Sequence, residues 1–128
     1  MTPQSDAFLE KARELIARAP ALLAQGFSEE AGRAAYLAGF HAAQALIFER
    51  EGRVLKTHKG VQGELGRLMK DDARFDIDLR TFLGRAYNLK AIADYETGPG
   101  SKISEAQATE AIEGARHLIL TVETAVGA

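Results

Sequence analysis

The sequence predicts an all-α protein, an antiparallel up-and-down bundle of four to five helices. Along most of the chain, apolar residues recur at the three- and four-residue spacing of a helix, and no segment alternates in the manner of a strand. Capping residues and breaks at glycine or proline divide this pattern into five helical segments with short connections. With 128 residues, the chain is expected to form one helical domain spanning residues 1–128.

The first helix is predicted to run from about Ser5 to Ala19, because Pro20 is expected to interrupt it. Its charged residues fall on the outer side of the helix. The side chains expected to face the core are Phe8, Ala12, Leu15 and Ile16.

The second helix is predicted from an N-cap at Ser28 to the residue before Gly52, and it has no continuous polar face. Small and aromatic residues fill the segment 32–43, together with one arginine, Arg33, and one histidine, His41. A helix that is apolar on all sides must be buried on all sides. We therefore expect it at the centre of the core, or sharing one face with a second subunit. Its two polar residues then need a partner or a functional role.

Three further helices are placed by their start signals. The third is predicted over residues 57–70, although it contains three glycines, and the fourth over residues 78–95. The segment 97–101 is the clearest loop in the chain. The fifth helix begins with a capping box of Ser104 and Gln107. Its apolar stripe is Ala108, Ala111, Ile112, Ala115, Leu118, Ile119 and Val122.

The composition excludes several functional classes. A net charge of −2 gives no reason to expect non-specific binding to nucleic acid, so an RNA contact would need a local patch. The chain has no cysteine, which is typical of a reducing compartment. Neither an apolar run of about 18 residues nor a secretion signal occurs, so we expect a cytoplasmic protein without a membrane contact. Metal-ligand and phosphate-loop motifs are missing, and no metal or other cofactor is expected.

The predicted fourth helix carries the most informative polar arrangement. Tyr87, Lys90 and Asp94 lie about one turn apart along the border of its apolar stripe, and Tyr95 ends the helix. A cation, a carboxylate and a phenol at a helix end can bind a phosphate or position a hydroxyl group. An ordinary pair of lysine and aspartate explains the same spacing.

The three histidines fall in different settings. His41 lies on the apolar helix, where a core role and a binding or catalytic role are both open. Thr57, His58 and Lys59 open the third helix, whose free backbone N–H groups attract anions. These residues can contact a phosphate, or they can simply cap the turn. His117 lies on the polar face of the last helix and is expected to be solvated.

Three motifs together resemble the HEPN domain, and more narrowly the small stand-alone prokaryotic HEPN proteins. They are the run Arg33-Ala34-Ala35-Tyr36-x-x-x-Phe40-His41-Ala42-Ala43, the segment Thr57-His58-Lys59-Gly60-Val61, and Ala93-Asp94-Tyr95 followed by the helix capped at Ser104. The resemblance covers about residues 5–124, with the elements in the order of the family.

This resemblance implies a four- or five-helix bundle that is usually a homodimer. Such proteins are often encoded beside a minimal nucleotidyltransferase, as a toxin–antitoxin-like pair. Active members are RNA endonucleases that need no metal, and they use an arginine and a histidine four to six residues apart on a late helix. In some pairs, the transferase adds adenylate to a tyrosine just after that histidine.

At the matching positions this chain has Lys90 in place of the arginine and Asp94 in place of the histidine. Lysine lacks the guanidinium fork that grips a phosphate with two hydrogen bonds. A carboxylate is less suited than imidazole to proton transfer at neutral pH. Tyr95 matches the tyrosine that is modified in some relatives.

Two hypotheses follow. In the first, the protein is the HEPN subunit of a toxin–antitoxin-like module. It forms a homodimer, has a nucleotidyltransferase as its partner, and itself cleaves RNA without a metal. The residues assigned to catalysis are Lys90, Asp94 and His41, with His58 as the other candidate for proton transfer. The residues assigned to the nucleotide or phosphate are Arg33, Thr57, His58 and Lys59, and Tyr95 is the candidate modification site. In the second hypothesis, which the departures at Lys90 and Asp94 favour, the bundle is a non-catalytic module that binds a nucleotide or adapts a protein partner.

Overall fold

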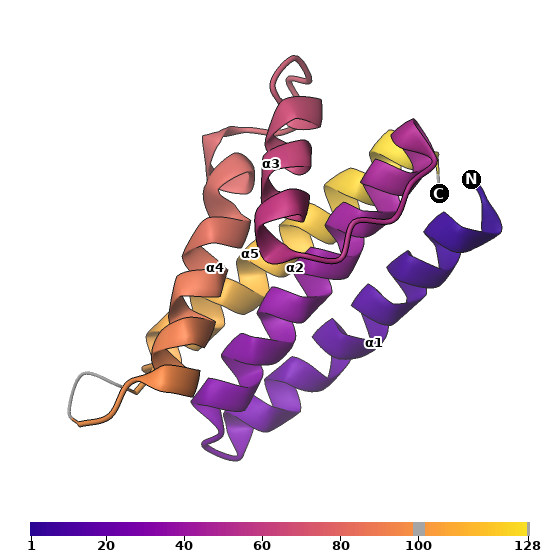
Figure 1. The fold of residues 1–128 in the computed structure, drawn as a ribbon. Coiled ribbons are helices and arrows are strands. Elements are labelled where there is room, and N and C mark those ends of the chain that lie inside the picture. Colours follow the sequence, from indigo (N-terminus) through magenta and orange to yellow (C-terminus); the bar gives the residue numbers. More distant parts are fainter. Residues whose placement is uncertain (99–101, 128) are drawn as a thin grey trace.

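In the residues that the computed structural model describes, 1–98 and 102–127, the backbone forms five α-helices and no strand (Figure 1). In chain order the helices are α1 (Pro3–Ala24), α2 (Ser28–Glu51), α3 (His58–Met69), α4 (Ile77–Tyr95) and α5 (Glu105–Val126). The predicted fold class is confirmed, and the four long helices run alternately up and down (Figure 1). None of the helices in these residues is both long and apolar enough to cross a membrane.

Helix α2 is the centre of the bundle. It packs against each of the other four helices, and more than half of its residues are buried. The expectation that a helix without a polar face lies at the centre of the core is confirmed. Every other element is therefore placed by its contact with α2.

The short helix α3 has a different relation to its neighbours. The segment between α2 and α3 turns back along α2, so α3 points in the same direction as α2 and packs against both α2 and α4 (Figure 1). The buried side chain of Gln44 holds this segment, because its Nε2 atom donates a hydrogen bond to the Leu55 carbonyl oxygen at 2.7 Å. The N-terminus of α3 consequently lies beside the middle of α2.

The prediction that Pro20 interrupts the first helix is wrong, since α1 continues to Ala24. Proline costs a helix one backbone hydrogen bond. Here packing holds the turns around it, because Ala19 is fully buried and Leu22 and Leu23 are half-buried against the core.

In the first half of the chain, one helix cap was predicted incorrectly, and the burial predicted for α1 is confirmed only in part. Ser28 is the first residue of α2 rather than its N-cap, and Phe27 takes the cap position without a side-chain hydrogen bond. In α1, Leu9 and Ala12 are fully buried, because this face meets both α2 and α5. The other side chains expected to face the core are only half-buried at the border of that face, and they are Phe8, Leu15 and Ile16.

The later helices begin where the sequence predicts, to within one residue. The Thr57 hydroxyl caps α3, Asp76 caps α4, and Ser104 with Gln107 forms the predicted capping box of α5. All the residues of the predicted α5 stripe are buried. In the predicted loop, residues 97 and 98 lie outside the helices, and residues 99–101 lie outside the described residues.

Phe82 of α4 determines how closely three helices approach one another. Its ring packs against Gly39 of α2 and Gly114 of α5, and at either glycine an added Cβ would lie only 2.5 Å from a ring carbon. Glycine at these two positions therefore allows α4 to pack against both α2 and α5.

Replacing Gly114 by alanine is expected to lower the free energy of unfolding by about 1–3 kcal/mol, because the new methyl group would overlap the Phe82 ring. Urea unfolding followed by circular dichroism measures this change. Gly63→Ala is the matched control, since a Cβ at the exposed Gly63 of α3 meets no atom within 4 Å. Alanine there favours the helix by up to about 1 kcal/mol. Equal stability of the two variants would contradict this account of the packing.

Candidate functional site

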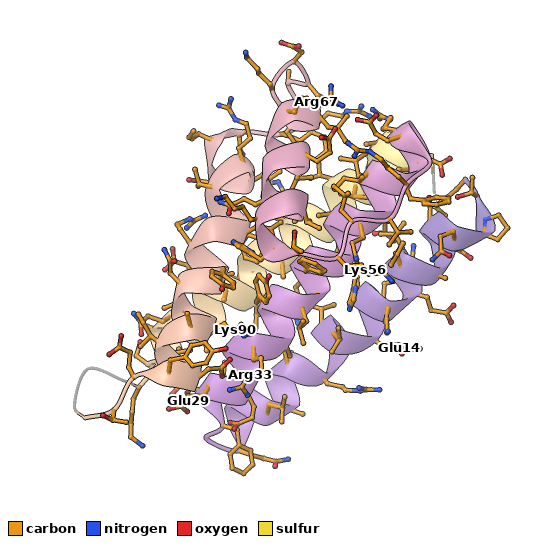
Figure 2. The ribbon with its side chains drawn as sticks, in the orientation of Figure 1. Glu14, Glu29, Arg33, Lys56, Arg67 and Lys90 are labelled. Atoms are coloured by element: carbon orange, nitrogen blue, oxygen red, sulfur yellow. The ribbon has the colours of Figure 1, made fainter. Side chains whose placement is uncertain are left out.

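The candidate site begins with an ion-pair network between α2 and α4. Arg33 of α2 and Lys90 of α4 meet at the carboxylate of Asp94, near the C-terminus of α4 (Figure 2). Arg33 donates to Oδ1 from Nη2 at 2.5 Å and from Nε at 3.2 Å, and Lys90 Nζ lies 2.8 Å from Oδ2. The side chains of Arg33, Lys90 and Asp94 are 35%, 22% and 19% exposed, so the network is partly enclosed but open to solvent.

The network combines two cations with one carboxylate. Hydrogen bonds from Lys90 and then from Arg33 lower the pKa of Asp94, so this carboxyl group is ionised at neutral pH. The same contact with Asp94 raises the pKa of Lys90. Among the described residues, Arg33 Nη1 has no hydrogen-bond partner and Lys90 bonds only to Asp94. Both cations therefore keep free donors for another anion.

Aromatic rings lie beside Lys90. Its Nζ atom is 5.9 Å from the centre of the Tyr87 ring and 5.8 Å from the centre of the Tyr95 ring. Tyr95 is 77% exposed, whereas Tyr87 is half-buried and stacks on His58 with the ring centres 3.7 Å apart. An exposed aromatic ring next to a cation is a surface on which a nucleobase can stack.

Tyr36 of α2 and His58 of α3 form the buried side of the site. The Tyr36 hydroxyl lies 2.9 Å from His58 Nδ1, and burial, followed by the effect of Tyr87, raises the pKa of Tyr36 to about 12. Burial also lowers the pKa of His58, and Lys90 lowers it further, against a hydrogen bond with Gln62 that raises it. In the described residues, His58 is the acceptor within reach of the Tyr36 hydroxyl. We therefore expect the hydroxyl to donate to Nδ1, with the proton of the neutral imidazole on Nε2.

The other residues at the start of α3 differ in their freedom to bind a ligand. The Thr57 hydroxyl accepts a hydrogen bond from the Gly60 backbone N–H at 3.0 Å and so serves as a helix cap. Lys59 is exposed and forms no ion pair with a described residue. His58 stacks on Tyr87 and so connects the start of α3 to α4. Lys59 is the next residue in the sequence after His58.

The structure does not bring His41 into contact with Lys90 or Asp94. The His41 ring instead stacks on Phe8 of α1 at 6.3 Å, and its Nδ1 atom lies 2.7 Å from Gln44 Oε1. Burial lowers the pKa of His41, Gln44 raises it and Lys11 lowers it.

Two contacts of the site were not predicted from the sequence. Arg33 and Asp94 were assigned to different roles, yet they form one ion pair across 61 positions of the chain. Tyr36 belongs to the segment of small and aromatic residues that is expected to be buried, and the hydroxyl of a buried tyrosine usually needs a hydrogen-bond partner. That requirement is the one signal in the sequence that points to the contact with His58.

A groove of about 310 Å³ between α4 and α5 is another place where a small molecule could lie, and hollows of similar size lie elsewhere on the surface. Its lining is mostly apolar and includes Arg85 and Glu110. Among the described residues, no group of three or more histidine, aspartate and glutamate side chains is arranged to hold a metal ion.

These features define a class of protein, an all-α bundle in which three helices bring cations and aromatic rings to one surface. The family model described as "HEPN domain" matches residues 5–125, and the chain belongs to this family. The structure is also similar to the crystal structure of TT1696 from Thermus thermophilus, with a TM-score of 0.78 and 23% sequence identity over 96% of this chain and 98% of that one. At this identity the likeness concerns the fold. No curated protein matches the chain.

Replacing Tyr36 by phenylalanine is expected to raise the pKa of His58 toward its ordinary value, because the hydroxyl that donates to the neutral imidazole is lost. The free energy of unfolding should fall by about 1 kcal/mol. Nitrogen-15 NMR of the imidazole groups, recorded as a function of pH, reports both the pKa and the proton position.

In the wild-type protein, this experiment should place the His58 proton on Nε2. The exposed His117 provides a reference in the same spectra, and Tyr95→Phe is the matched control because Tyr95 does not contact His58. A wild-type His58 with its proton on Nδ1 would show that Tyr36 is not the donor.

Proposed function

We propose that this HEPN protein is the cytoplasmic RNA-binding subunit of a toxin–antitoxin-like module, and that it cleaves RNA without a metal ion. The observation that supports the proposal is the meeting of Arg33 and Lys90 at one carboxylate beside two tyrosine rings. The free donors of the two cations suit the oxygens of a phosphate, and the rings suit the neighbouring bases.

Each residue then has a chemical role. In metal-independent cleavage, the ribose 2′-hydroxyl attacks the adjacent phosphorus and the bond to the 5′ oxygen breaks. Overall, one proton moves from the 2′ oxygen to the 5′ oxygen. Lys90 and Arg33 hold the phosphate, and Asp94 orients these two side chains. Asp94 is not assigned the proton transfer, because its lowered pKa makes it a weak base. We assign the proton transfer to His58 rather than His41, since His58 contacts the Tyr87 ring beside Lys90.

A homodimer is part of the proposal. Phe8 of α1 and Leu37 and Phe40 of α2 are apolar side chains that remain half-buried at the surface. A second copy of the chain would cover them, and the two copies would then place two sites in one particle.

Incubation of the purified protein with total RNA in EDTA tests the proposed activity. The wild type is expected to cleave, and Lys90→Ala and Arg33→Ala are expected to lose at least about tenfold in rate, as expected for a lost contact to the reacting phosphate. Lys70→Ala, at the opposite end of α3, is the matched control and should cleave normally.

The same assay separates the two histidines, because His58→Ala should be inactive and His41→Ala active. Equal cleavage by the Lys90→Ala and Lys70→Ala variants would exclude this site as the catalytic centre.

One observation favours a second function, the non-catalytic binding of a nucleotide or a protein partner. Asp94 already bonds to both cations, and it stands where a histidine would be expected from the family resemblance. An intact, folded protein that binds RNA or nucleotides but does not cleave RNA would support this function.

The exposed Tyr95 is the residue that we propose as the target of a nucleotidyltransferase partner. If a minimal transferase encoded beside this gene is added with ATP, mass spectrometry should detect one adenylate group on each chain. Tyr95→Phe should abolish the modification, whereas Tyr87→Phe should retain it because Tyr87 is half-buried against His58. Adenylate on another residue would contradict the assignment.

A further inference from the structure

The site contains one more positive than negative charge. Arg33 and Lys90 share the single carboxylate of Asp94, and both oxygens of that carboxylate are engaged. Glu29 lies one turn before Arg33 on α2 but forms no ion pair with it in the described residues (Figure 2). The three groups in contact therefore sum to a net charge of +1.

A second ion-pair network among the described residues has equal numbers of positive and negative charges. On α2, α3 and the segment between them, Arg53 and Arg67 pair with Glu51 and Glu64, two cations with two carboxylates. Asp72 and Arg74 form an ion pair of one carboxylate with one cation. Within the described residues, the excess cation at Asp94 thus distinguishes the candidate site from these structural ion pairs.

We propose that Asp94 is a specificity-determining residue, whose charge reduces the advantage that a phosphomonoester, with two negative charges, has over a phosphodiester, with one. The inference deepens the proposed function and rests on it. A phosphomonoester carries a charge of about −1.5 to −2 at pH 7, whereas a phosphodiester carries −1.

The physical reason is repulsion at short range. A phosphate that takes the free donors of Arg33 and Lys90 must lie next to the Asp94 carboxylate, because the same two side chains bind both groups. Each negative charge of the ligand is attracted by the two cations and repelled by that carboxylate, so the carboxylate reduces the gain in affinity from a second charge. Loss of the carboxylate charge therefore favours the dianion more than the monoanion.

The test compares AMP with its methyl phosphate ester, which has the same base and one charge fewer. Binding is measured by NMR titration of the wild type and of Asp94→Asn at low salt. We expect the wild type to bind AMP less than about tenfold more tightly than the ester. In Asp94→Asn, the affinity for AMP should rise about fivefold to tenfold more than the affinity for the ester.

Two variants make the result specific. Asp72→Asn is the matched control, because Asp72 pairs with Arg74 in the turn before α4, and it should leave the ratio of the two affinities unchanged. Asp94→Glu keeps the charge and should keep the wild-type ratio. If Asp94→Asn does not fold, the wild-type comparison still decides, since binding of AMP tenfold more tightly than the ester would overturn the inference.

The outcomes also separate this inference from the proposed function. If both probes shift the signals of Arg33 and Lys90 but Asp94→Asn leaves the ratio unchanged, the inference is wrong and phosphate binding at the site stands. If neither probe affects Arg33 or Lys90 in the wild type, phosphate binding at this site is wrong, and the inference is overturned with it.

Discussion

The burial of α2 is the constraint on which the rest of the structure depends. A helix that is apolar on all sides needs neighbours on all sides, and the other four helices supply them. The buried polar groups of α2 then need partners from those neighbours, because an unpaired buried polar group costs about 1–3 kcal/mol. Tyr36 meets His58, and Gln44 meets Leu55. The partly exposed Arg33 meets Asp94. The candidate site is the place where the contacts of Tyr36 and Arg33 lie side by side.

The energies involved indicate that the ion-pair network serves binding more than stability. A lysine and an aspartate four residues apart on a helix contribute only about 0.2–0.5 kcal/mol, and exposed ion pairs contribute about 0–1 kcal/mol. Packing contributes far more, as the contact of Phe82 with Gly39 and Gly114 illustrates. The cations at Asp94 can therefore exchange one partner for another at little cost to the fold, which is what an anion-binding site requires.

Most of the fold could be predicted from the sequence, because helix starts and apolar stripes depend on residues close together in the chain. The α5 stripe and the caps at Thr57 and Ser104 are of this kind. The continuation of α1 past Pro20 could not be predicted, since tertiary packing outweighs the missing hydrogen bond. In the site, Lys90, Asp94 and Tyr95 share one helix end and were found together. Their contact with Arg33 depends on how α2 and α4 pack, which periodicity does not reveal.

The most direct test of the central claim is to observe the cations themselves while a phosphate binds. Nitrogen-15 NMR can follow Arg33 Nε and Lys90 Nζ during a titration with the methyl ester of AMP at low salt. Both signals should shift with one common dissociation constant, while Arg85 at the groove between α4 and α5 stays unchanged. Shifts at Arg85, with Arg33 and Lys90 unaffected, would place the ligand in that groove and contradict the account.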